Sequence, residues 1–155
     1  MSCAGRAVRG AWAPLERLWQ RAAQPFEPVA ELPSPSLPLR ARQQWLRRAM
    51  QGTRPELNDL APAGSSHHLA WRQTLLDSLD RLPQNSVVFT HFIAINVAVA
   101  AALSREDVVC FWPDHASITC VAAGNGSLRL VEPGPPSGHD DSGARLNRRE
   151  NLAWL

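Results

Sequence analysis

The sequence predicts an α/β fold with a mostly parallel β-sheet. Residues 86–90 and 107–111 are short apolar runs typical of buried strands, and residues 93–103 between them are apolar on nearly every side, which indicates a helix packed against a sheet. A strand, a helix and a second strand at this spacing predict a βαβ crossover, the unit from which parallel sheets are built. Residues 117–122 and 127–131 flank Gly124-Asn125-Gly126, a turn sequence that predicts an antiparallel hairpin at one end of the sheet.

Three further helices are expected before this unit. Apolar residues that recur every three or four positions predict helices over residues 7–23 and 39–51. The same spacing predicts a third helix that begins at Leu69 and carries its apolar stripe to Leu82. Each of these helices is expected to have one apolar face.

The connections between these elements set the domain boundaries. Residues 28–32 are expected to be extended, and three prolines predict a loop over residues 33–38. Residues 53–66 have no periodicity, so we expect a long surface connection there. The chain is polar and rich in glycine and proline after Pro133, which predicts one domain over residues 1–133 and a mobile tail over residues 134–155.

Composition and charge exclude several classes of partner. The 155 residues carry a formal net charge of +2, and the basic residues are spread along the chain, so we expect no nucleic-acid partner. No apolar run approaches the roughly 20 residues of a membrane-spanning helix, so we expect no membrane partner and a cytoplasmic location. Three cysteines at irregular spacing fit neither a disulfide framework nor a zinc site. Cys110 and Cys120 are expected to be reduced thiols inside strands, and no cofactor is expected.

His91 is the strongest candidate for a functional residue. It follows the expected strand over residues 86–90 and precedes the expected helix over residues 93–103. Ligands of open α/β sheets bind at this position, where a phosphate meets the free amides and the positive dipole end of the helix. An imidazole titrates near neutrality, so His91 could donate a hydrogen bond or a proton to such a ligand. The alternative is that His91 only caps the strand.

Several short motifs together resemble the histidine phosphatase superfamily, whose members are phosphoglycerate-mutase-like. Thr90-His91-Phe92, the apolar helix after it, and Asp114-His115-Ala116-Ser117-Ile118-Thr119 at the start of the hairpin are similar to the C-terminal half of that superfamily. Upstream, Ser2-Cys3-Ala4-Gly5-Arg6-Ala7 resembles its Ser-Pro-x-x-Arg-Ala element. Val29-Ala30-Glu31-Leu32 resembles the segment that bears the family's acid, and Trp71-Arg72 also fits the family pattern.

The resemblance implies a three-layer α/β/α fold and a role for each matching residue. His91 would contact the transferred phosphoryl group and stabilise the transition state. Arg6 would bind a phosphate oxygen through its planar guanidinium group, and Glu31 would donate a proton to the leaving oxygen. Phe92 stands where glycine is usual and would narrow the phosphate-binding pocket. The substrate would be a small phosphate ester, and the activity that of a phosphatase or a mutase.

One defining motif of the superfamily does not occur in the sequence. Its members carry Arg-His-Gly at the end of their first strand, and that histidine takes the phosphoryl group covalently. No Arg-His-Gly occurs in the 155 residues. We therefore expect a chain that is truncated before its first strand and is inactive or nearly so, because loss of a covalent nucleophile costs several orders of magnitude in rate. The missing strand would leave an open sheet edge, so a homo-oligomer is also expected.

Two functions stay open at this point. The first is phosphoryl-transfer hydrolysis of a small phosphate ester by the complete protein. The second is a non-catalytic module that binds a phosphate ester through Arg6 and His91. A metal site built from the five histidines is not expected, because His67-His68 is not a ligand spacing and no cysteine or carboxylate cluster joins it. A serine hydrolase is not expected either, since there is no Gly-x-Ser-x-Gly motif.

Overall fold

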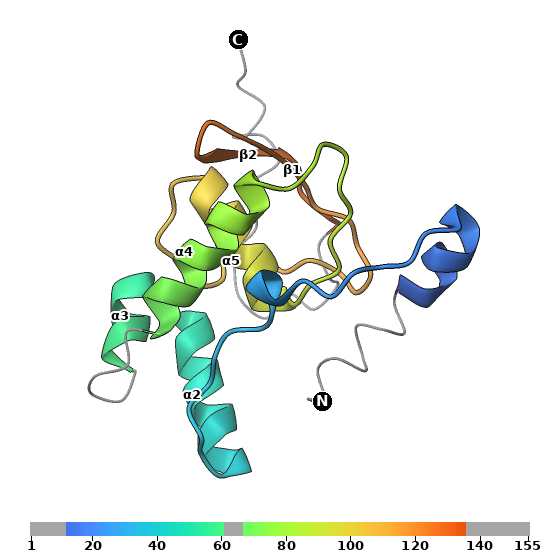
Figure 1. Cartoon of the computed structure of the whole chain (residues 1–155). Helices are drawn as coiled ribbons and strands as arrows, with labels where there is room; N and C mark the ends of the chain where they lie inside the picture. Colours follow the sequence, from blue (N-terminus) through green and yellow to red (C-terminus); the bar gives the residue numbers. More distant parts are fainter. Residues whose placement is uncertain (1–11, 61–66, 136–155) are drawn as a thin grey trace.

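The computed structural model describes residues 12–60 and 67–135 of the chain (Figure 1). A hairpin lies at one end of helices α4 and α5, and helices α2 and α3 lie toward the other end. The elements in chain order are a helical stretch over residues 12–19, the 3-10 helix η1 (Glu27–Val29), α2 (Leu39–Gln51), α3 (Arg54–Asp59), α4 (His67–Asp80), α5 (Phe92–Ala102), β1 (Cys120–Gly124) and β2 (Ser127–Glu132).

Helix α5 is the centre of the core. Seven of its 11 residues are buried, and the side chains of Val99 and Asn96 are fully buried. One core cluster contains Ile93 and Val97 of α5, and Leu75 of α4 is fully buried in it. A second cluster contains Val99 of α5, and Leu130 of β2 packs against it. Because other elements surround α5, its sequence is apolar on nearly every side.

The helices expected from periodicity are present. The helix expected over residues 39–51 is confirmed as α2, and the helix expected from Leu69 is α4, which begins two residues earlier, at His67. Within the expected helix over residues 7–23, the helical stretch ends at residue 19, and residues 7–11 lie outside the described part. Residues 28–32, which were expected to be extended, begin inside η1.

The expectation of an irregular connection over residues 53–66 is wrong for its first half. Helix α3 forms there because the Glu56 carboxylate accepts hydrogen bonds from the Thr53 N–H (2.7 Å) and the Thr53 hydroxyl (2.9 Å). These bonds lower the pKa of the Glu56 carboxyl below its ordinary value. Pro55 lies in the first turn, where a missing N–H costs no helical bond. Residues 61–66 lie outside the described residues.

The expected fold class is wrong. Within residues 12–60 and 67–135 the only sheet is the antiparallel pair β1–β2, so the described chain is not a three-layer α/β/α domain with a mostly parallel sheet. Residues 86–90 belong to no helix or strand, and Val87 is 61% exposed. Residues 107–111 form a single isolated bridge, from Asp107 to Thr53. An apolar run identifies a segment that can enter a sheet, but pairing also needs a neighbouring strand, which these segments do not have in the described chain.

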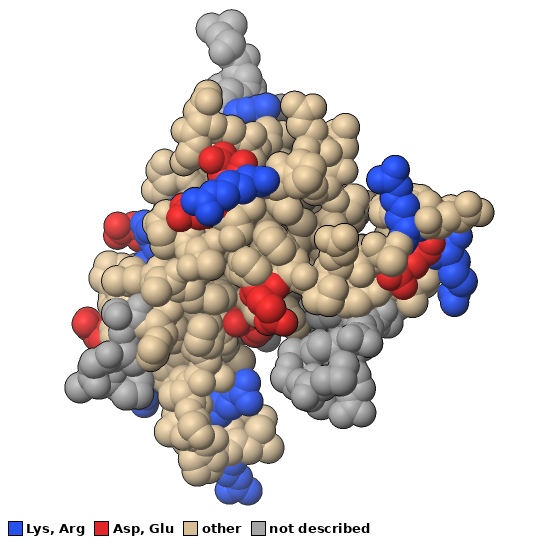
Figure 2. Space-filling view, in the orientation of Figure 1, with Lys and Arg blue, Asp and Glu red and all other residues tan. Residues whose placement is uncertain are grey.

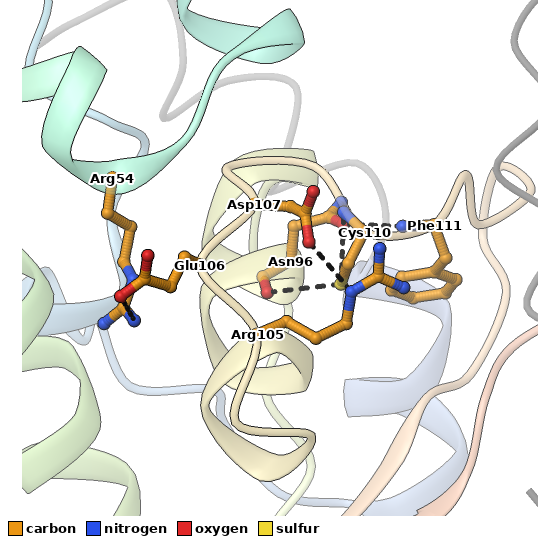
Figure 3. A network of polar contacts seen from close by, with 7 residues as sticks. All are labelled: Arg54, Asn96, Arg105, Glu106, Asp107, Cys110 and Phe111. Carbon is orange, nitrogen blue, oxygen red and sulfur yellow. Dashed lines mark hydrogen bonds and ion pairs between the residues drawn. The ribbon is translucent and has the colours of Figure 1, made fainter.

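The buried side chain of Asn96 takes the place of a strand partner for residues 107–111 (Figure 3). Its Oδ1 accepts hydrogen bonds from the backbone N–H groups of Cys110 (2.9 Å) and Phe111 (3.1 Å). Its Nδ2 donates to the carbonyl of Phe92 one turn earlier in α5 (3.1 Å). Buried backbone amides must be paired, and one amide side chain here satisfies two of them. The segment is therefore buried, as expected, without being a strand.

The expected hairpin is present, but its first strand begins at Cys120 rather than at residue 117 and includes Gly124. β1 and β2 pair antiparallel with Gly124 opposite Ser127, which leaves Asn125 and Gly126 as a two-residue loop. Both loop residues have positive φ, 55° and 74°, as a tight turn between twisted strands requires. The N–H of Gly126 donates to Asp80 Oδ2 at the end of α4 (3.2 Å), and this bond fixes the turn against the helix. The predicted tail over residues 134–155 lies outside the described residues from residue 136 on, so the domain boundary at residue 133 stays a prediction.

The cysteines differ from one another in their surroundings. Cys110 was expected in a strand, but it is a fully buried residue outside any strand, whereas Cys120 lies in β1 and is partly exposed. Burial raises the pKa of the Cys110 thiol to about 11. The thiolate is the reactive form, so Cys110 is expected to be inert in the folded protein.

This prediction can be checked with a thiol reagent at pH 8. In a Cys3→Ser background, the folded chain is expected to react quickly with one equivalent, through Cys120. A Cys3→Ser, Cys120→Ser chain is expected to react only after urea is added, because unfolding exposes Cys110 and returns its pKa to the ordinary range. Rapid labelling of Cys110 without urea would contradict the prediction.

Candidate functional site

His91 is the N-cap residue of α5. Its backbone is extended (φ −105°, ψ 162°), and its carbonyl accepts the first helical hydrogen bond, from the Ile95 N–H (3.0 Å). The imidazole makes no capping bond to the helix. The first-turn amides of α5 therefore have no partner within the helix, and they lie beside a histidine side chain that is not used to cap it. This arrangement suits an anion.

The structure brings Glu31 next to His91, although 60 residues separate them in the sequence. The distance from His91 Nδ1 to Glu31 Oε2 is 3.7 Å, and the two side chains are 23% and 40% exposed. The other carboxylate oxygen of Glu31 accepts the N–H of Leu32 (2.9 Å). A carboxyl group and an imidazole thus lie side by side at the start of α5, both within reach of solvent. In a site for a phosphate ester, such a carboxyl group would act as the proton donor and such an imidazole would bind the phosphate.

Three side chains hold the backbone on either side of Glu31. Among the described residues this segment has no strand partner, and its carbonyls accept hydrogen bonds from side chains of distant residues instead. The bonds run from Thr90 Oγ1 to the carbonyl of Val29, from Trp71 Nε1 to that of Ala30 (3.2 Å), and from His68 Nε2 to that of Pro33 (2.8 Å). Because a carbonyl oxygen only accepts, Nε2 of His68 carries the hydrogen. The position of the carboxylate therefore depends on α4 and on the residue before His91.

Removal of one of these donors should have a measurable cost. Trp71→Phe keeps an aromatic ring in a half-buried position but deletes the N–H that binds Ala30, so the free energy of unfolding is expected to fall by about 1–2 kcal/mol. Urea unfolding followed by circular dichroism measures this difference. Trp19→Phe is the matched control, because Trp19 is 50% exposed, and it should change stability by less than about 0.5 kcal/mol. Equal effects of the two substitutions would contradict the assignment of this bond.

The other two predicted site residues have different outcomes. Arg6 lies outside the described residues. Phe92 follows His91 at the first position of α5, is partly buried, and packs against Trp112 with ring centroids 4.9 Å apart. Phe92 also lines a cavity of about 230 Å³ that Glu31 lines too. The expected narrowing of the phosphate-binding pocket by Phe92 stays a prediction.

The cavity contains residues that the sequence analysis did not identify. Arg42, Leu46 and Met50 line it from α2, one helical turn apart from one another. The spacing of four between Arg42, Leu46 and Met50 places them on one stripe of α2, next to the stripe of the core residues Trp45 and Ala49. Apolar periodicity predicts the helix and its buried face, but it does not indicate that a cavity lies beside the adjacent stripe.

Charges on this side of the molecule are separated rather than concentrated. Figure 2 shows acidic side chains in the middle of the face, where η1 lies in Figure 1, and basic side chains lower on the face, over α2. The described basic residues on this face lie in separate patches, and the absence of a nucleic-acid partner stays a prediction. A small ligand between η1 and α2 would meet both signs of charge.

Two kinds of site have no support among the described residues. No group of three or more His, Cys, Asp or Glu side chains in residues 12–60 and 67–135 is placed to hold a metal ion. Across the same ranges, every helix is too short or too polar to span a lipid bilayer. The cytoplasmic location and the homo-oligomer stay predictions.

Comparisons with models of known protein families, with curated proteins and with solved structures found no match to this chain.

Proposed function

We propose that the chain binds a phosphate monoester between His91 and the start of α5, at a site of the histidine phosphatase kind. The observation that carries the proposal is the 3.7 Å approach of Glu31 Oε2 to His91 Nδ1 at a helix N-terminus. The motifs around these two residues were matched to that superfamily separately, 60 positions apart. Because Glu31 and His91 lie side by side, the two short motifs contribute to one site, and this supports the proposal.

Each group at the site has a chemical role in the proposal. The dianionic phosphate accepts hydrogen bonds from the first-turn amides of α5 and from the imidazole of His91. In a protein that also supplies the nucleophilic histidine, a ring nitrogen of that histidine would form the new bond to phosphorus, and protonated Glu31 would donate its proton to the ester oxygen as the ester bond breaks, so that the alcohol leaves in neutral form. The Leu32 N–H and the bonds around Val29, Ala30 and Pro33 hold the carboxyl group in place.

The presence or absence of a nucleophile distinguishes hydrolysis of a phosphate ester from binding without turnover. Hydrolysis by the superfamily's route requires the histidine of Arg-His-Gly, and the 155 residues do not contain that triplet. For this sequence we therefore expect binding of a small phosphorylated ligand without turnover. Hydrolysis is the function of the same site in a protein that also supplies the nucleophilic histidine.

Binding and turnover can be measured on the same preparation. Calorimetry near pH 6 is expected to show saturable binding of phenyl phosphate, and His91→Ala is expected to weaken it by at least about tenfold, because a hydrogen bond to a charged group is lost. His115→Ala is the control, since His115 is exposed and lies outside the site. Release of p-nitrophenol from p-nitrophenyl phosphate is expected to stay at the uncatalysed rate. Equal affinity of the His91→Ala chain would sink the proposal.

A further inference from the structure

The cavity beside Glu31 has an apolar wall, of which Leu46 is the exposed part. Helix α2 buries Trp45 and Ala49 in the core, and Met50 packs against the same core cluster. Leu46 and Met50 lie on the adjacent stripe of the same helix and line the cavity, where Leu46 stays 38% exposed. Leu32 forms another part of this wall. An apolar wall that is partly open to solvent is typical of a site for a small organic ligand.

The cavity joins the phosphate site at one end. Glu31 lines it, and Phe92 lines it directly after His91 in the sequence. The proposed role of Glu31 is to protonate the ester oxygen, so the organic group attached to that oxygen must lie on the Glu31 side of the phosphate. The cavity is on that side. The Phe92 ring packs against Trp112 and gives the cavity an aromatic lining surface.

The other end of the cavity is basic. Arg42 lines the cavity two turns before Met50, which corresponds to about 12 Å along the axis of α2. In Figure 1 the chain after η1 runs beside α2 toward the start of that helix, and Ser34 of this segment also lines the cavity. Arg42 is the single positively charged residue in the lining. A ligand that extends from Glu31 along α2 would therefore reach a guanidinium group at its far end.

The size of the cavity limits the ligand. Its volume of about 230 Å³ is below the range of roughly 300–1,000 Å³ typical of sites for drug-sized ligands. One ring or a short chain fits, and a nucleotide or an oligosaccharide does not. We propose, on the basis of the proposed function, that the ligand is a phosphate monoester with a single apolar ring or short apolar chain next to the ester oxygen and a carboxylate at the far end that binds Arg42.

Three ligands separate the parts of this proposal. Calorimetry with the full 155-residue chain is expected to show the tightest binding for 4-carboxyphenyl phosphate, followed by phenyl phosphate and then glycerol 3-phosphate. The dissociation constants of the last two are expected to differ about tenfold, because only phenyl phosphate buries a ring. Leu46→Ser is expected to lower the affinity for phenyl phosphate about fivefold and to leave the affinity for glycerol 3-phosphate unchanged. Leu39→Ser on the same helix is the control, since Leu39 is 72% exposed and does not line the cavity.

The role of Arg42 has its own test. Arg42→Gln is expected to remove the preference of about fivefold for 4-carboxyphenyl phosphate over phenyl phosphate and to leave the affinity for phenyl phosphate unchanged. Arg47→Gln, an exposed residue of α2 outside the cavity, should change neither. If Arg42→Gln weakens both ligands equally, the arginine binds the phosphate itself, and the carboxylate part of the proposal is wrong.

The failure of this inference can be told from the failure of the proposed function. If all three esters bind with one affinity that depends on His91, the phosphate site stands and the apolar cavity does not select the ligand. If no ester and no inorganic phosphate binds, both are wrong.

Discussion

An Asn96→Leu chain is expected to have a free energy of unfolding about 2–6 kcal/mol lower than that of the original chain. Leucine has nearly the same shape as asparagine, so the cavity term is small. The N–H groups of Cys110 and Phe111 would lose their shared acceptor inside a buried segment. Each buried amide that is left without a partner costs about 1–3 kcal/mol, and two are affected.

The comparison is made by urea unfolding with circular dichroism. Gln44→Leu in α2 is the matched control, because it replaces an exposed amide side chain by leucine in another helix and should change stability by less than about 0.5 kcal/mol. A loss below about 1 kcal/mol for Asn96→Leu would contradict the network in Figure 3.

The second large effect is expected for Leu75→Ala, which should lower the free energy of unfolding by about 2–5 kcal/mol. Leu75 is fully buried where α4 packs into the core cluster that contains residues of α5, so its truncation leaves a cavity that the helices can close only in part. Leu69→Ala is the control on the same helix, because Leu69 is 52% exposed. Thermal or urea unfolding of both variants measures the difference. Similar losses for the two leucines would show that α4 does not pack as described.

The helices could be predicted from the sequence because their signal is local. α2 and α5 carry regular apolar spacing or a continuous apolar run, and both were located within one or two residues. Helix α3 was missed because Pro55 and nearby polar residues hid its start. The capping pair Thr53 and Glu56 was visible in the sequence as a Thr-x-x-Glu pattern.

The sheet could not be predicted in the same way because strand pairing is not a local property. Residues 86–90 and 107–111 have the composition of buried strands, but a segment becomes a strand only when another backbone lies beside it. For residues 107–111 the side chain of Asn96 supplies the acceptor instead. A polar residue in the middle of an otherwise apolar helix was the available sign of this role, since buried polar groups must be paired.

The candidate site was partly accessible from the sequence. His91 could be identified from its place before a helix, and the structure keeps it there as the N-cap. Its approach to Glu31 could be expected only through the family resemblance, because no periodicity links residues 60 positions apart. The side chains that hold the Glu31 backbone, among them His68 and Trp71, could not be predicted, since each bonds to a carbonyl more than 30 positions away.

The most direct test of the phosphate site is the NMR signal of the His91 imidazole during a titration with phenyl phosphate. We expect the His91 ring signals to shift and to saturate with the dissociation constant that calorimetry gives, while the ring signals of exposed His67 and His115 stay in place. The same titration of a Glu31→Gln chain should still shift His91, because Gln keeps the size of the side chain at the site. A His91 signal that does not move at saturating ligand, or one that moves equally with the two exposed histidines, would contradict a phosphate ester bound between His91 and the start of α5.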